Sequence, residues 1–491
     1  MRILKHCLTL ALVLFTAFDT GIAQQNPPPN IVYILADDLG YGELGCYGQT
    51  KIRTPNIDAL AKEGMRFTRH YSGSAVCAPS RCVLLTGKHT GQSFVRANTE
   101  GGGWGPNEPE GQTPIADQVL TIAEVLKTKG YQTAAIGKWG LGGPGSAGHP
   151  CFQGFDLFYG YLCQRVAHNY YPTHLWKNHD VDVLGNKYFA AHQKIKEPPA
   201  ESTAWEKYSG DVYATDRMIE EAEQFVRQNK SKPFFLYYPT VVPHVAIQVP
   251  EDSLAEYEGE FEETPYLGSK GYLPHPQPRA AYAAMITRMD RNVGRIVSLL
   301  GELKLLENTL IIFSSDNGPT YAGGADSKFF NSSGPLRGLK GSLFEGGIRV
   351  PMIARWPGKI EAGSTSNHVS GFQDIFPTMC ELVGVDVPAD VNGLSMLPTL
   401  IGKTNDQKHH ECMYWELRNK QAVLCGDWKM YRVSNKAGEI KSHLFNLKSD
   451  PSEMKNLVES EPEQMNRLIQ TAKKSRQKSE LFPSPFESTT D

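Results

Sequence analysis

Polar residues follow four short apolar runs of this sequence, each at the point where the run stops. These residues are Asp37 and Asp38 after "NIVYILA", Lys138 after "TAAIG", His244 in "TVVPH", and Asp316 and Asn317 after "LIIFSS". Continuous apolar runs of this length are typical of strands that are buried on both faces of a parallel sheet. Because ligands of open α/β sheets bind outside the carboxyl ends of the strands, we expect these polar groups to form one site.

The acidic members of this set indicate a cation. Adjacent carboxylates repel each other, so two of them together with a third and an amide at one sheet edge are expected chiefly around a cation that prefers oxygen ligands. A "DD" or a "DNG" alone is more often a solvated turn. Their shared position at strand ends favours a calcium or magnesium site.

A second chemical feature is the stretch "AVCAPSRCVLLTG" around Cys77. Pro79 suits the first turn of a helix, which "SRCVLLT" continues until Gly87 can cap it. Cys77 is therefore predicted to lie just ahead of a helix N-terminus, where free N–H groups and the helix dipole favour an anion. Arg81 projects from the first turn on the same side. The stretch predicts an anion-binding site beside Cys77.

Helical patterns alternate with the apolar runs, at residues 54–64, 121–130 and 279–303. This alternation predicts an α/β fold with a large, mostly parallel central sheet flanked by helices. After about residue 400, short alternating segments and a charged helical tail predict a smaller antiparallel sheet with a helix. We expect a catalytic α/β domain over 24–400 and a C-terminal α+β subdomain over 401–491. The aromatic, loop-rich segment from about 151 to 275 is expected to lie over the sheet edge.

The composition of the 491 residues is ordinary for a globular protein, and a formal net charge of −3 gives no reason to expect a nucleic-acid or membrane-surface partner. Arg2 and Lys5 precede an apolar run at 8–18 that is too short to span a bilayer, and Ala23 precedes a cleavage site. Residues 1–23 are therefore predicted to be a signal peptide, and the mature protein to be secreted or periplasmic. Nine cysteines, one of them in this segment, leave the disulfide pairing open. The oligomeric state also stays open.

These motifs resemble those of the type I sulfatases, in the alkaline phosphatase superfamily. "CAPSR" followed by "LLTG" is similar to the family signature, in which the cysteine is converted enzymatically to formylglycine before folding. Further matching blocks are "PNIVYILADDLGYGELGCYG", "GYQTAAIGKWGLG", "FSSDNGP" and "LRGLKGSLFEGGIRVPMIARWPG". The resemblance implies a sulfuric ester hydrolase with one Ca²⁺ and a formylglycine. It also implies a formylglycine-generating or equivalent maturation enzyme as a partner. Export favours a sulfated carbohydrate as the substrate.

The resemblance also implies a role for individual residues. The implied calcium ligands are Asp37, Asp38, Asp316, Asn317 and the modified Cys77. The implied catalytic groups, which hold the modified residue and the sulfate or lie near the leaving group, are Cys77, Arg81, Lys138, Lys340 and His244. Arg349 in "EGGIRVP" lies in a matching motif and is interpreted as support for these groups.

A hydrated aldehyde explains why a thiol precursor is modified. One hydroxyl, polarised by the cation and deprotonated by a base such as Asp316, attacks sulfur and displaces the alcohol, which His244 or Lys340 protonates. When the second hydroxyl loses its proton, the carbonyl re-forms and sulfate leaves by C–O cleavage.

One position departs from the family pattern. The family block is GKWHLG, whose histidine contacts the formylglycine, but Gly140 stands at that place here. His168 in "RVAHNYYP" or a water molecule is the candidate substitute. Tyr170, Tyr171 and Trp176 are candidates for stacking on a sugar ring, although core packing is the expectation for at least two of them.

Two other functions remain open. The first is a formylglycine-dependent phosphodiesterase or phosphonate hydrolase, against which Lys138, Lys340 and the "LKGSLFEGG" block argue. The second is an inactive, secreted carbohydrate-binding relative, which requires that Cys77 is never modified or that Gly140 has disabled turnover.

Overall fold

The computed structural model describes residues 27–102 and 109–487. The predicted signal peptide, residues 1–23, lies outside the described residues. Among the residues described, no helix is long and apolar enough to cross a membrane.

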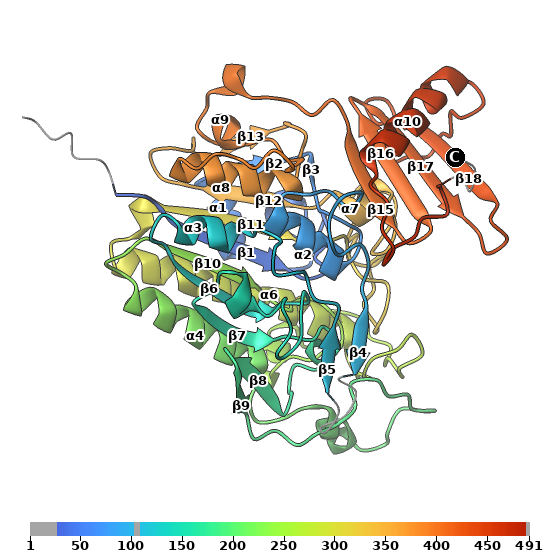
Figure 1. Ribbon diagram of the computed structural model, residues 1–491. Helices are drawn as coiled ribbons and strands as arrows, with labels where there is room; N and C mark the ends of the chain where they lie inside the picture. The colour runs from blue at the N-terminus through green and yellow to red at the C-terminus, as the bar shows by residue number, and fades with distance from the viewer. Residues whose placement is uncertain (1–26, 103–108, 488–491) are drawn as a thin grey trace, which may run out of the picture.

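A ten-stranded mixed sheet forms the centre of the molecule (Figure 1). Its five middle strands run parallel, in the order β11 (Thr309–Ser315), β1 (Asn30–Ala36), β10 (Phe234–Pro239), β6 (Gln132–Lys138) and β7 (Leu157–Tyr161). Every residue of β1, β10 and β11 is buried, as expected of strands covered on both faces. The predicted parallel sheet is therefore confirmed.

Shorter strands extend both edges of this parallel core. On one side lie β12 (Met352–Arg355), β2 (Met65–Phe67) and β13 (Ser364–Ser366), and on the other lie β8 (His174–Lys177) and β9 (Asp180–Val183). The prediction that segment 151–275 lies over the sheet edge is wrong for β7 to β9. These strands extend the sheet edge to edge, because β7 pairs parallel with β6, and β8 and β9 follow as antiparallel neighbours.

Helices cover both faces of the sheet. On one face, α1 (Pro55–Lys62), α4 (Ala214–Gln228) and α6 (Pro278–Glu302) pack against Val32, Ile34 and Ala36 of β1. On the other, α2 (Cys77–Thr86), α3 (Ile122–Lys127) and α8 (Ile375–Val383) pack against Ile31, Tyr33 and Leu35. Alternate residues of one strand thus enter two separate cores. The helices expected near 54–64, 121–130 and 279–303 correspond to α1, α3 and α6.

The remaining short elements lie in connections. They are α5 (Glu251–Leu254), α7 (Glu345–Ile348), α9 (Leu397–Leu400) and two small sheets formed by β3 (His70–Tyr71) with β14 (Ser370–Gly371) and by β4 (Glu100–Gly102) with β5 (Glu110–Gln112).

A four-stranded antiparallel sheet follows near the C-terminus, to one side of the central sheet (Figure 1). Its strands are β15 (Met413–Leu417), β16 (Lys420–Cys425), β17 (Trp428–Ser434) and β18 (Ile440–Asn446). The helix α10 (Pro462–Ser475) packs on one face through Met465 and Leu468. The other face packs through Trp415 against Tyr71 and Ile348 of the larger fold. The predicted small antiparallel sheet with a helix is confirmed.

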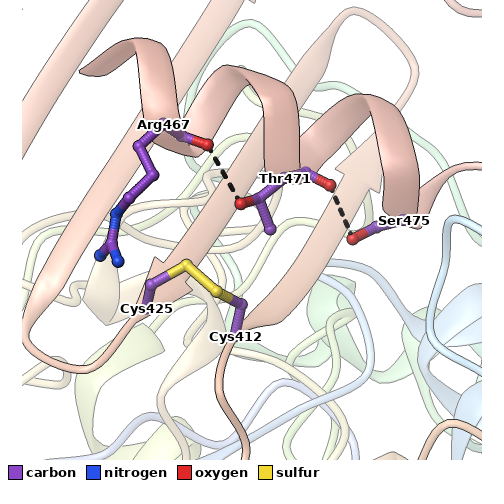
Figure 2. The surroundings of a disulfide bond; sticks show 5 residues. All are labelled: Cys412, Cys425, Arg467, Thr471 and Ser475. Carbon is purple, nitrogen blue, oxygen red and sulfur yellow. Dashed lines mark hydrogen bonds between the residues drawn. A yellow bond between two sulfur atoms is a disulfide. The ribbon is translucent and has the colours of Figure 1, made fainter. Parts of the chain in front are cut away.

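A disulfide joins Cys412 to Cys425 at the edge of this sheet, beneath α10 (Figure 2). The pairing register places Met413 opposite Leu424, so the two cysteines are cross-strand neighbours. Among the described residues, the free cysteines are Cys46, Cys77, Cys82, Cys151, Cys163 and Cys380. The sheet register thus settles a pairing that the sequence left open.

Candidate functional site

The carboxyl ends of β1, β6, β10 and β11 bring the predicted polar residues to one edge of the sheet. Asp37 and Asp38 follow β1, Asp316 and Asn317 follow β11, Lys138 ends β6, and His244 lies in the loop after β10. Backbone hydrogen bonds connect these strand ends, from Asp37 N to Val242 O (3.0 Å) and from Asp316 N to Ala36 O (3.0 Å). Segments that are about 200 to 280 residues apart in the chain are therefore held in one rigid frame.

Cys77 is the first residue of α2, so the helix begins slightly earlier than predicted. Pro79 is its third residue, where the missing N–H is no loss because the first four N–H groups of a helix have no intrahelical partner. Gly87, with φ of 71°, ends the helix as predicted, and its N–H donates to Val83 O. Cys77 is only 1% exposed.

The thiol of Cys77 lies between two ammonium groups and a carboxylate. Its Sγ is 3.6 Å from Lys138 Nζ, 3.6 Å from Lys340 Nζ and 3.4 Å from Asp37 Oδ1. Lys138 Nζ also contacts Asp37 Oδ2 at 2.5 Å, and Lys340 Nζ contacts Asp38 Oδ2 at 2.8 Å. Burial, and secondarily Asp37, raises the pKa of the Cys77 thiol. An unmodified thiol is thus protonated and a weak nucleophile at this position.

Arg81 contacts the carboxylates rather than the thiol. Its Nη2 lies 2.8 Å from Asp316 Oδ2 and 3.5 Å from Asp37 Oδ2, and its Nη1 donates to the backbone oxygen of Lys138. The guanidinium is fully buried, so these charge-assisted bonds fix Asp37, Lys138 and Asp316 relative to one another.

The acidic groups of the site fit a hard cation. Asp37, Asp38, Cys77 and His244 are buried and offer ligand atoms within 4.8 Å of one another. Asn317 Nδ2 donates to Asp38 Oδ1 (2.7 Å), whereas its buried Oδ1 has no hydrogen-bond partner among the described residues. The unpaired buried amide oxygen and the neighbouring carboxylates together form a set of oxygen ligands that suits Ca²⁺ or Mg²⁺.

Asp316 and Asp38 are buried close to other negative charges, which disfavours their ionised forms. Burial, followed by the charge of Asp37, raises the pKa of Asp316 to about 7. Burial also raises the pKa of Asp38, although Lys340 opposes it. A bound cation would offset both effects, since it favours the ionised carboxylates.

His244 is buried against Asp38, with 3.8 Å between Nε2 and Asp38 Oδ2. Its Nδ1 lies 2.5 Å from Val245 O, which can only accept, so Nδ1 carries the proton of the neutral ring and Nε2 faces the site. Burial, with Lys340 and Lys138, lowers the pKa of His244. The ring is stacked on that of His168, with centroids 5.0 Å apart.

The space beside Gly140 is filled by Gln164, which sequence reasoning missed. Gly140 has φ of 81°, and a Cβ added there would lie 2.8 Å from Gln164 Nε2. In the orientation that satisfies both ends of its amide, Gln164 donates to Glu100 Oε1 (3.1 Å) and accepts from Ala78 N (3.2 Å). It therefore contacts the helix residue next to Cys77, whereas His168 stacks on His244 instead. Gly140 and Gln164 are 24 positions apart, with loop and strand between them, so no local sequence motif predicts their contact.

A second contact that the sequence did not reveal connects the C-terminal sheet to the Lys340 loop. Lys429 of β17 is fully buried and bridges Glu345 Oε1 (2.8 Å) and Glu453 Oε1 (2.9 Å). Lys420 Nζ also donates to Gly341 O (2.5 Å), next to Lys340. The C-terminal sheet thus holds the loop that carries Lys340.

The other expected residues take structural positions. Tyr170 and Tyr171 are buried, as core packing requires, whereas Trp176 is half-buried. Arg349 Nε donates to Thr68 O (2.7 Å), outside the group around Cys77.

His149, Cys151 and His179 form another group whose ligand atoms lie within 4.8 Å of one another. Both ring nitrogens of His149 are already engaged, Nδ1 by Cys151 N (3.2 Å) and Nε2 by Asn178 O (3.1 Å). The carboxylate-rich group at the strand ends therefore has the better chemistry for a metal.

Comparisons with known proteins agree with this geometry. A family model described as Sulfatase matches residues 29–385, and one described as N-sulphoglucosamine sulphohydrolase, C-terminal, matches residues 339–480. The N-acetylgalactosamine-6-sulfatase of Canis lupus familiaris is 31% identical over 86% of this chain and 74% of its own. The N-acetylgalactosamine-6-O-sulfatase of Bacteroides thetaiotaomicron is 30% identical over 92% and 94%. Human arylsulfatase A is 32% identical over 91% and 86%.

A solved structure of Ps i-CgsB in complex with k-i-k-neocarrahexaose superposes with a TM-score of 0.73 and 28% identity over 94% of this chain and 96% of its own. The Sulfatase model covers most of the chain, including the strand ends, the helix that begins at Cys77 and the Lys340 loop. The chain therefore belongs to the sulfatase family and is a sulfuric ester hydrolase.

Proposed function

We propose that this protein is an exported sulfatase that removes sulfate from a carbohydrate and depends on a formylglycine at position 77 and one calcium ion. One observation carries the proposal: the buried Cys77 Sγ lies 3.6 Å from both Lys138 Nζ and Lys340 Nζ, beside acids that suit a cation. A carbohydrate substrate is supported by the relatives named for sulfated N-acetylgalactosamine and by the neocarrahexaose complex of a similar structure.

The burial of Cys77 supports modification before folding. A side chain that is 1% exposed at the start of a helix is out of reach of another enzyme in the folded protein. A formylglycine-generating or equivalent enzyme is therefore the expected partner during export, and the signal peptide at 1–23 is the expected route.

Each site residue then has a role in the proposed reaction. The calcium ligands are Asp37, Asp38, Asp316, Asn317 and residue 77. The hydrated aldehyde and the calcium ion supply a hydroxyl nucleophile and the charge that polarises it. Lys138 and Lys340 hold the sulfate oxygens and stabilise the charge that builds on them during transfer.

Protons move at two points of the site. Asp316 is the base for the attacking hydroxyl, because Arg81 and a bound cation would keep its carboxylate ionised and able to accept a proton. Lys340 Nζ, the ammonium group paired with Asp38, delivers a proton to the departing alcohol, because the neutral His244 ring carries its proton on Nδ1 and offers Nε2 only as an acceptor. Arg81 keeps the carboxylates in place without touching the thiol.

Gln164 takes over the position beside Gly140. An amide is neither an acid nor a base, so it holds the first turn of α2 through Ala78 N rather than moving a proton. The elimination step then depends on a water molecule, because His168 is stacked against His244.

The division of the chain at about residue 400 is part of the same proposal. The strands β15 to β18 and helix α10 share a core of their own, which includes Met430, Leu444 and Leu468. We assign 24–400 to the catalytic domain and 401–491 to a subdomain that supports the Lys340 loop.

A rate comparison tests the reaction type. The mature protein, produced together with a formylglycine-generating enzyme, is assayed on 4-nitrophenyl sulfate, on an aryl phosphate diester and on sulfated mono- and oligosaccharides. We expect sulfate release from at least one saccharide and a higher kcat/KM on the aryl sulfate than on the diester. Dominant diesterase activity would contradict the proposal.

A further inference from the structure

Tyr272, in the loop before α6, faces the candidate site. Its ring meets three histidine rings, with centroid distances of 5.8 Å to His244, 5.0 Å to His168 and 4.6 Å to His192. The ring of His168 in turn lies flat on that of His244, with 12° between the planes. The side chain is half-buried. These four rings form a wall beside Nε2 of His244, which faces the site.

The backbone of Tyr272 is held in an unfavourable conformation. Its φ of 68° is in the left-handed region, which a bulky aromatic residue rarely adopts. Tyr272 N donates to His192 Nδ1 (3.3 Å), Tyr272 O accepts from Gln193 N (3.4 Å), and Tyr266 Oη donates to Gly271 O (2.6 Å). The loop is thus fixed on both sides of the strained residue. Strain that is maintained by surrounding contacts is typical of residues that meet a ligand.

The hydroxyl of Tyr272 differs from those of the neighbouring tyrosines. Tyr170 is fully buried and donates to Val241 O (2.7 Å) and His244 O (2.6 Å), so its hydroxyl is satisfied within the protein. Within the described part of the chain, the Tyr272 hydroxyl makes no hydrogen bond. Burial raises its pKa to about 12, opposed by Lys340, so it stays protonated and able to donate. A protonated donor therefore remains available at the wall.

We propose that Tyr272 is a specificity-determining residue, whose hydroxyl donates a hydrogen bond to an oxygen of the sugar that carries the sulfate. The rings of Tyr272 and His168 hold the apolar face of that sugar next to His244. This inference rests on the proposed carbohydrate sulfatase function. It predicts that Tyr272 acts on sugar substrates and not on sulfate esters that lack sugar hydroxyls.

The test compares Tyr272→Phe with the wild type on two substrates. One is 4-nitrophenyl sulfate, and the other is the best substrate among N-acetylgalactosamine 6-sulfate, glucosamine 6-sulfate, galactose 6-sulfate and galactose 4-sulfate. Tyr131→Phe is the matched control, since its hydroxyl bonds Pro29 O at the opposite end of β6 from Lys138. Thermal unfolding of each variant verifies the fold.

We expect Tyr272→Phe to lower kcat/KM on the sugar about ten-fold, as for one lost hydrogen bond, and to leave the aryl sulfate within about two-fold of wild type. Tyr131→Phe should leave kcat/KM unchanged on both substrates. Equal losses on both substrates, or no loss on the sugar, would overturn the role of Tyr272. A wild type that cleaves the aryl sulfate but none of the sugars overturns the carbohydrate assignment and this inference with it, whereas a wild type inactive on every sulfate ester rejects the proposed function itself.

Discussion

Two groups of buried charges, which approach each other in the sequence at Lys340 and Glu345, differ in what surrounds them. The strand-end site comprises Asp37, Asp38, Cys77, Arg81, Lys138, Asp316, Asn317 and Lys340. The subdomain ion cluster comprises Glu345, Lys429 and Glu453. In the cluster, one lysine bridges two glutamates between the two sheets. In the strand-end site, a thiol lies between two lysines and an amide oxygen has no partner among the described residues.

This difference distinguishes a group of residues that can bind ligands from a group that joins two parts of the fold. Burial of charge is common to both groups, so burial does not identify the site. The strand-end site keeps a thiol that is not in a disulfide and an amide oxygen that the described residues do not pair, whereas the subdomain ion cluster joins β17 to the loop that carries Lys340. Variants of one group should change either activity or stability, and comparing both measurements shows which group each property depends on.

The largest effect is expected for Cys77→Ala. In the proposed mechanism the nucleophile derives from this residue, so kcat should fall by more than ~10³-fold. The thiol makes only weak contacts, so the thermal unfolding midpoint should stay within a few degrees of wild type. Sulfate release and differential scanning calorimetry measure the two. Substantial remaining activity would reject residue 77 as the nucleophile.

The opposite pattern is expected for Lys429→Met. Removing the lysine leaves Glu453 buried without its cation and Glu345 with only Arg349 at 3.5 Å, which costs about 3–5 kcal/mol of the free energy of unfolding. Denaturant unfolding measures the loss. The triple variant Lys429→Met, Glu345→Gln and Glu453→Gln is the matched control, and it should recover much of the stability. If the single variant is as stable as wild type, the cluster does not hold the two parts together.

Calcium removal should act on the strand-end site alone. Chelation by EGTA is expected to abolish activity and to lower the stability of the wild type by about 2–3 kcal/mol, if calcium was present at roughly 100 times its Kd. The control is Asn317→Ala, which lacks the unpaired amide oxygen and should require more calcium for the same activity. If EGTA changes neither the activity nor the free energy of unfolding of the wild type, the calcium site is contradicted.

The smallest effect concerns Glu43, a buried acid for which the described residues offer no cation partner. Gly40 N and Tyr282 Oη donate to its carboxyl, and burial raises its pKa to about 7. The folded state therefore binds this proton more tightly than the unfolded state, whose pKa is about 4.3. The resulting stability is full below about pH 4 and is lost as the pH rises to about 7.

Glu43→Gln tests this assignment, because it keeps the shape of the side chain and removes its titration. Its free energy of unfolding should depend less on pH between about 4 and 7 than that of wild type. Urea unfolding at several pH values gives the comparison. Parallel curves for the two proteins would show that Glu43 does not titrate as described.

The sequence predicted that these polar residues meet at one edge of the sheet, because most of them follow a local pattern. The apolar runs before Asp37, Lys138 and Asp316 became β1, β6 and β11, and the shared strand direction brought their ends together. Pro79 and Gly87 likewise defined α2 to within a few residues.

The parts that the sequence did not predict depend on contacts between distant segments. Gln164 reaches Gly140 and Ala78 across two loops, and Lys429 meets Glu345 from another sheet. Such contacts follow from the packing of whole elements, and no spacing within one segment encodes them. The same holds for Tyr272, whose strained backbone is set by His192 and Tyr266.

The central claim is that residue 77 works as formylglycine rather than as a thiol. Mass spectrometry of the peptide that contains Cys77, from active protein made with a formylglycine-generating enzyme, tests it most directly. We expect a peptide with the mass of the aldehyde or its hydrate, in a fraction that rises in proportion to kcat across preparations. Fully active protein that carries only unmodified cysteine at position 77 would contradict it.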